Sequence, residues 1–185
     1  MDKPSFLSIG NLLKAYRNAR KSRKESYEVY LFDQNREEHL LRMRDELISG
    51  HYVHGAYRNI VLKDSKKRYI SSPSFRDHIL HHLVYQEIYP ILDSKMVHST
   101  FACRHGFGHH RGCLYLRSLI RDMTKTTLGD LFYLKLDFSK YFFSIHQDRL
   151  KLKLRKHIHD VFLLSIIDQI IESYQSPNVY DELLS

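Results

Sequence analysis

Residues 131–145 read LFYLKLDFSKYFFSI and are more informative than any other stretch of the sequence. Five of its first six residues are apolar, which is typical of a strand buried in a sheet. Asp137 follows these residues directly and lies among aromatic residues. Because a charge at the end of a buried strand needs a cation or a hydrogen-bonded partner, Asp137 is a candidate metal ligand. The alternative is an aspartate that caps the turn after the strand.

A β-hairpin is predicted upstream of this stretch. Residues 57–63 and 68–71 have the character of two strands, and residues 64–67 have the character of the turn between them. Lys66, Lys67 and Arg68 would lie at the tip of the hairpin. Cations at such a tip can close over a triphosphate, because their donors match phosphate oxygens.

A helix is predicted to begin after Pro73 and Ser74, since Ser74 and Asp77 have the spacing of a capping box. Apolar residues at helical spacing form its core-facing stripe: Leu80, Leu83, Val84, Ile88 and Ile91. Further helices are predicted over residues 10–24, 33–49 and 110–124, and after Asp160, with Gly50 ending the second of these. Two more stripes are predicted to be core: Leu116, Leu119, Ile120 and Met123, and Leu163, Ile166, Ile167 and Ile170.

Composition favours a helix-rich protein with an anionic partner. The chain has 185 residues, enough for one sizeable core, and only 7 Gly and 4 Pro. Its 29 Lys and Arg exceed its 21 Asp and Glu, which gives a net charge of +8. Neither a signal peptide nor an apolar stretch long enough to cross a bilayer is evident, so we expect a soluble, cytoplasmic protein without a membrane partner. Two cysteines, Cys103 and Cys113, do not make a disulfide framework.

A run of cations near the N-terminus is a candidate nucleic-acid site. Its members are Arg17, Arg20, Lys21, Arg23 and Lys24. They can grip a phosphate backbone or form a solvated helix face, and the sequence leaves both readings open.

Four blocks in a fixed order carry further information. They are KRYI at residues 67–70 with PSFRD at 73–77, HH at 81–82 in a helix with YPI at 89–91, FACRHGFGH at 101–109, and LKLD at 134–137 with KYF at 140–142. In this order they resemble the N-terminal half of a reverse transcriptase. The most similar kind is the bacterial enzyme of diversity-generating retroelements, which is related to retron and group II intron enzymes.

The resemblance implies an α+β fold of polymerase fingers plus a partial palm, rich in helix, with a β-hairpin and a short antiparallel sheet. Residues 1–130 would form the N-terminal helices and fingers. Residues 131–175 would form the first part of the palm, with the 131–137 strand packed against the helices at 110–124 and 160–174. Residues 176–185 would be a polar tail.

The resemblance also implies an activity, RNA-directed DNA synthesis by a two-metal mechanism. Its partners would be an RNA template, a DNA primer and deoxynucleoside triphosphates. Such enzymes hold two Mg²⁺ ions roughly 3.5 to 4 Å apart on hard oxygen ligands. By the resemblance, Asp137 is the first palm carboxylate, and the main-chain carbonyl of Phe138 is a second ligand.

Other positions would bind the incoming nucleotide. The resemblance places Lys67, Arg68 and Arg104 where basic fingers residues contact the triphosphate. Phe142 falls at the position whose ring blocks a ribose 2′ hydroxyl and so selects deoxynucleotides. An aromatic residue after a strand can equally pack in the core.

The chain departs from the family pattern at Phe107, Phe143 and His146, where a Lys, a small residue (or Pro or Asp) and an Asp are usual. The sequence also contains no adjacent Asp-Asp pair, so the Tyr-x-Asp-Asp hairpin is missing. Because one carboxylate cannot hold two Mg²⁺ ions, these 185 residues alone are predicted to be inactive. Activity would need a C-terminal half or an accessory protein.

Two competing functions stay open. One is a noncatalytic basic RNA-binding or zinc-stabilised module, whose candidate zinc ligands are Cys103, His105, His109, His110 and Cys113. Their spacing matches no standard zinc finger, and neighbouring arginines oppose a dication. The other is an interaction protein that exposes a sheet edge and acts by pairing with another chain.

Overall fold

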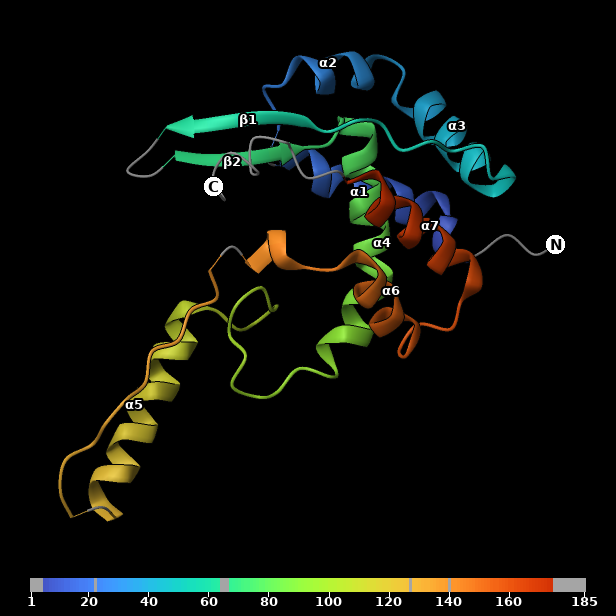
Figure 1. The fold of residues 1–185 in the computed structure, drawn as a ribbon. Helices are drawn as coiled ribbons and strands as arrows, with labels where there is room; N and C mark the ends of the chain where they lie inside the picture. Colours follow the sequence, from blue (N-terminus) through green and yellow to red (C-terminus); the bar gives the residue numbers. More distant parts are fainter. Residues whose placement is uncertain (1–4, 22, 64–66, 127, 140, 175–185) are drawn as a thin grey trace. The chain divides into compact units, whose positions relative to one another are not determined.

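The computed structural model describes residues 5–21, 23–63, 67–126, 128–139 and 141–174, and shows an α+β fold rich in helix (Figure 1). It divides into two compact units. One is formed by Met1–Tyr89 together with His146–Ser185, and the other by Pro90–Ile145. The predicted boundary between residues 130 and 131 differs from this division, because the last helices join the N-terminal helices. The predicted tail at 176–185 lies outside the described residues.

The N-terminal helices of the first unit are η1 (Ser5–Leu7), α1 (Ile9–Lys21), α2 (Tyr27–Gln34) and α3 (Arg36–Ser49). The helix predicted over residues 33–49 is confirmed as α3 apart from its start, because Asn35 between α2 and α3 has a non-helical backbone. Gly50 ends α3 as predicted, with a left-handed φ of 74° and an N–H that donates to the carbonyls of Glu46 and Leu47.

The predicted hairpin is confirmed. Strands β1 (Arg58–Lys63) and β2 (Lys67–Ser72) pair antiparallel, with Ile60 opposite Ile70. Lys66 lies outside the described residues. The hairpin leads through Pro73 and Ser74 into α4 (Phe75–Asp93).

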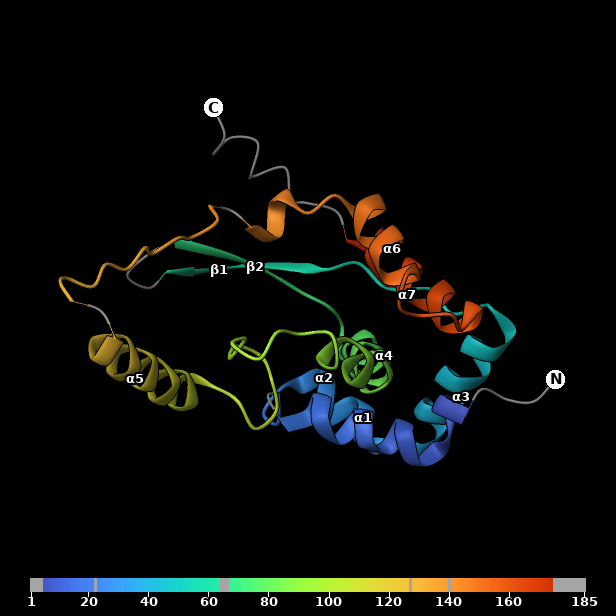
Figure 2. The same cartoon turned by 90° about the horizontal axis from the view of Figure 1, so that it is seen from below.

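The core of the first unit gathers around α4. Phe75 at its start packs edge-on against Tyr16 of α1 and Phe32 of α2, with ring centroids 6.1 and 5.2 Å apart. The predicted stripes of α4 and of α7 (Val161–Ser173) are confirmed in part. Ile88, Ile91 and Ile170 are only half-buried, whereas six members are buried: Leu80, Leu83, Val84, Leu163, Ile166 and Ile167. Asp160 caps α7 by accepting the N–H of Leu163 at 2.9 Å. Figure 2 shows α6 (Gln147–Arg155) packed beside α7.

The second unit departs from the prediction. The helix predicted over residues 110–124 is confirmed as α5 (His109–Thr126), but its apolar stripe is exposed rather than core: Leu116, Leu119, Ile120 and Met123. The strand predicted over residues 131–137 was also wrong: this segment forms no ladder, and Phe132 is 90% exposed. A strand needs a neighbour for its backbone hydrogen bonds, and the described residues of this unit contain none. The segment is followed by η2 (Tyr141–Ser144).

None of the described helices combines the length and apolar character needed to cross a lipid bilayer.

Candidate nucleic-acid interface

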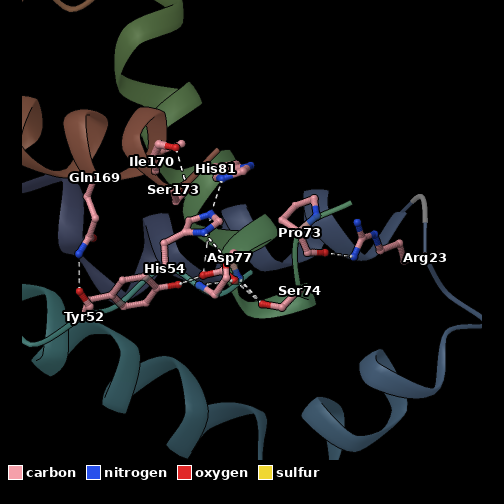
Figure 3. A network of polar contacts seen from close by, with 11 residues as sticks. Arg23, Tyr52, His54, Pro73, Ser74, Asp77, His81, Gln169, Ile170 and Ser173 are labelled. Carbon is pink, nitrogen blue, oxygen red and sulfur yellow. Dashed lines mark hydrogen bonds and ion pairs between the residues drawn. The ribbon is translucent and has the colours of Figure 1, made fainter. Parts of the chain in front are cut away.

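A buried carboxylate fixes the start of α4 beside the segment that leads into the hairpin (Figure 3). Asp77 accepts hydrogen bonds from the Tyr52 hydroxyl at 2.8 Å, the Gly55 N–H at 3.2 Å and the Ser74 hydroxyl at 2.6 Å. The Asp77 N–H in turn donates to Ser74 Oγ at 3.1 Å, as expected of a helix cap. These donors offset the cost of burying the charge.

At Gly55 the backbone itself lies against the Asp77 carboxylate. A Cβ added there would lie 3.0 Å from the Asp77 Oδ2 atom, so a side chain would displace the carboxylate. The Tyr52 carbonyl accepts a hydrogen bond from Gln169 of α7 at 2.5 Å. Residues 52–55 are therefore held between α4 and α7, which positions the first strand of the hairpin.

Two histidines extend this network. His54 Nδ1 lies 2.7 Å from the Gly55 carbonyl, which can only accept, so Nδ1 carries the proton of the neutral ring. His54 Nε2 is then an acceptor for the N–H at Nε2 of His81, 3.0 Å away. Burial and the neighbouring His54 lower the pKa of His81 to about 4. The His81 ring is therefore neutral near pH 7, and it stacks on the His54 ring with centroids 5.2 Å apart.

A groove of about 600 Å³ lies where the end of α1, the start of α2 and the hairpin meet. Its cations are Lys21, Arg23, Lys24 and Arg58, and its acidic residues are Glu25 and Glu28. The Arg23 side chain connects the segment after α1 to the end of the hairpin. It donates hydrogen bonds to Ser72 Oγ at 2.7 Å and to the Pro73 carbonyl at 3.0 Å. The groove thus brings cations from two segments of the chain together, which suits a phosphate backbone.

The run of cations predicted to bind phosphate is divided by the structure. Arg20 forms an ion pair with Asp33 at 3.0 Å, and Tyr16 donates to the same carboxylate, so Arg20 helps to hold α1 against α2. Arg17 is exposed on α1, whereas Lys21, Arg23 and Lys24 line the groove. Arg58 was not among the predicted residues. Its place in the groove depends on how the hairpin meets the end of α1, which no local pattern reports.

The predicted triphosphate contacts lie in different units. Lys67 and Arg68 are the first two residues of β2, and their side chains lie outside the described part of the structure. Arg104 belongs to the second unit, where its side chain is 8% exposed and pairs with Asp93 at 2.8 Å. Its guanidinium also donates to the carbonyls of Val97 and Thr100 at 3.2 and 3.3 Å. Arg104 therefore stabilises the loop before α5 in this structure.

The predicted palm residues all lie in the second unit. Asp137 and Phe138 are exposed in the extended segment, and Phe142 is 79% exposed in η2, so its ring is not part of a core here. The Asp137 carboxylate and Phe138 carbonyl are hard oxygen donors of the kind that Mg²⁺ takes. Within the described ranges, no three His, Cys, Asp or Glu side chains gather as a metal site. The type of donor at Asp137 and Phe138 therefore suits Mg²⁺, but no further ligand gathers around them among the described residues.

The candidate zinc ligands do not converge either. Cys113 Sγ lies 3.7 Å from His109 Nε2, one turn earlier on α5. Across the described residues of this loop and helix, no third ligand joins this pair.

No protein-family model matches this chain, and no curated protein sequence matches it.

Proposed function

We propose that this chain is the N-terminal part of an RNA-directed DNA polymerase, with basic fingers that bind the RNA template and primer and a segment that supplies the first palm carboxylate. The observation that supports this most is the basic groove beside the hairpin. The hairpin is the element on which the sequence places Lys67 and Arg68, and α4 follows it directly.

The electrostatics of the groove favour a polyanion. Four cations from two segments of the chain line it against two acidic residues, and the whole chain carries a net charge of +8. Glu28 lies 3.9 Å from Arg23, so one of the acidic residues already faces a cation. Binding of a phosphate backbone at such a surface releases counterions, which makes the affinity fall steeply as salt rises.

In the complete enzyme, Asp137 and the Phe138 carbonyl would hold Mg²⁺ together with carboxylates from outside this segment. Phe142 would exclude the ribose 2′ hydroxyl, and Lys67 and Arg68 would contact the triphosphate. The same groove would serve a noncatalytic RNA-binding module, which remains the alternative. Primer extension separates the two functions, because only the polymerase depends on Asp137.

Binding to nucleic acid tests the part of the proposal that the groove supports. Fluorescence anisotropy with a labelled RNA/DNA hybrid, repeated over a series of salt concentrations, should show affinity that falls as salt rises. The double variant Lys21→Gln/Lys24→Gln removes two phosphate contacts, so the slope of log K against log salt should become shallower by roughly 2. Arg117→Gln/Arg121→Gln, at two exposed positions of α5, is the matched control for loss of two charges. Binding that is indifferent to salt, or equal effects of both variants, would contradict the assignment.

A further inference from the structure

Beside the basic groove, α2 exposes two aromatic rings. Tyr27 is 73% exposed and Tyr30 is 61% exposed, whereas Val29 and Phe32 of the same helix are buried. The two tyrosine rings stack on one another, with centroids 6.2 Å apart and planes inclined by 22°. Tyr27 directly follows Ser26, which lines the groove.

We infer that the groove and this pair of rings form one binding site for single-stranded nucleic acid, in which the cations bind phosphates and Tyr27 and Tyr30 stack on unpaired bases. A charged groove next to stacking rings is the arrangement by which proteins bind single strands. In a duplex, the base faces are covered by neighbouring bases, so only a single strand can use both parts of the site. The inference deepens the proposed function, because it names the form of nucleic acid that this surface takes.

The aromatic pair also argues against an acidic peptide as the ligand. Acidic side chains would satisfy Lys21, Lys24 and Arg58 but would gain little from two flat, stacked rings. Nucleobases have a π-face on every residue and gain about 1 to 3 kcal/mol for each ring that they stack on. The combination of exposed rings with groove cations therefore favours nucleic acid.

A tryptophan reporter tests the site directly, since the chain contains no tryptophan. In the Tyr30→Trp variant, adding a single-stranded oligo(U) or oligo(dT) should quench the fluorescence of the new indole through base stacking. A blunt duplex of the same length should quench it much less. Tyr133→Trp, at an exposed position of the second unit, should not respond.

Affinity measurements then separate stacking from charge. The double variant Tyr27→Ala/Tyr30→Ala should weaken single-strand binding at least tenfold and duplex binding by less than twofold, with the salt slope unchanged. Tyr27→Phe/Tyr30→Phe keeps both rings and should restore binding to within about threefold of the wild-type value. Arg58→Gln should instead make the salt slope shallower by roughly 1.

Several results would overturn the inference. These are an indole at position 30 that does not respond to single strands, a tyrosine double variant that binds single strands normally, or equal losses on single strand and duplex. Polyglutamate that binds as tightly as oligo(U) would assign the surface to acidic peptides. Failure of the polymerase proposal looks different: the single-strand site would persist in a chain whose completed form does not extend primers.

Discussion

At the scale of single residues, Asp77 joins the segment before the hairpin to the start of α4. Its buried carboxylate accepts three hydrogen bonds, from Tyr52, Gly55 and Ser74. The cap formed by Ser74 follows from its spacing to Asp77 in the sequence. The bonds from Tyr52 and Gly55 do not, because these donors lie 25 and 22 residues away and no periodicity connects them.

Replacement of Asp77 should destabilise the protein strongly. Asp77→Ala leaves three donors without their acceptor, one of them the buried Tyr52 hydroxyl, so the free energy of unfolding should fall by about 3 kcal/mol. Tyr52→Phe removes only one of these hydrogen bonds and should cost about 1 kcal/mol. Glu38→Ala, at an exposed position of α3, is the control and should change stability by less than about 0.5 kcal/mol. Urea denaturation measures all three, and a loss for Asp77→Ala no larger than for Glu38→Ala would disprove the network.

His81 should make the protein less stable in acid. Its folded pKa of about 4 lies below the ordinary value of 6.5, so the unfolded chain takes up a proton over this range while the folded chain does not. The free energy of unfolding should therefore fall as pH decreases from about 6.5 to 4, by about 2 kcal/mol after allowance for partial solvent access. His81→Gln can still donate to His54 but does not titrate, so it should flatten this part of the pH profile. An identical profile for wild type and variant would show that His81 is not responsible.

At the scale of elements, the backbone conformation near two helix ends can be tested by replacing Gly50 and Gly10 with alanine. Gly50 has a left-handed φ of 74°, so Gly50→Ala should destabilise the protein by about 1 kcal/mol. Gly10 lies in α1 with open space around it, and Gly10→Ala should instead stabilise the protein by about 0.5 kcal/mol. Thermal unfolding measures both signs. Two shifts in the same direction would contradict the assigned backbone conformations.

Elements differ in how far their sequence predicts them. Local signals located α4, α5, α7, the hairpin and the caps at Ser74, Gly50 and Asp160. Apolar patterning did not predict that the stripe of α5 is exposed. It also did not predict that residues 131–137 form no strand. Apolar patterning reports what a segment can bury, whereas burial depends on a partner from elsewhere. The described residues of the second unit provide no such partner for either segment.

Only some of the residues that line the groove could be predicted, because their position also depends on distant parts of the chain. Lys21, Arg23 and Lys24 were predicted because they belong to a run of closely spaced cations, and they line the groove. Arg20 belongs to the same run but is held by Asp33, and spacing cannot separate the two cases. Arg58 lines the groove from β1, so its role could be recognised only from the three-dimensional position of the hairpin.

At the scale of the whole molecule, the two units should respond differently to proteolysis. Phe132, Tyr133 and Leu134 are exposed and lie in an extended segment that fits a protease cleft. Brief digestion with chymotrypsin should therefore cut first within residues 131–138. Tyr27 is also exposed, but its backbone is in α2 and should resist cleavage. Mass spectrometry of the first fragments identifies the site, and initial cuts in α2 would contradict the structure of the second unit.

The central claim, that this chain is part of a reverse transcriptase, predicts an activity that depends on Asp137. The decisive measurement is primer extension on an RNA template with Mg²⁺ and deoxynucleotides, by the chain alone and by the chain completed with a C-terminal half that carries Tyr-x-Asp-Asp. We expect no extension by the chain alone and extension by the completed form. In that form, Asp137→Asn should abolish synthesis, while Phe142→Ala should keep some synthesis and admit ribonucleotides. No extension by the completed form, or full extension after Asp137→Asn, would contradict the claim.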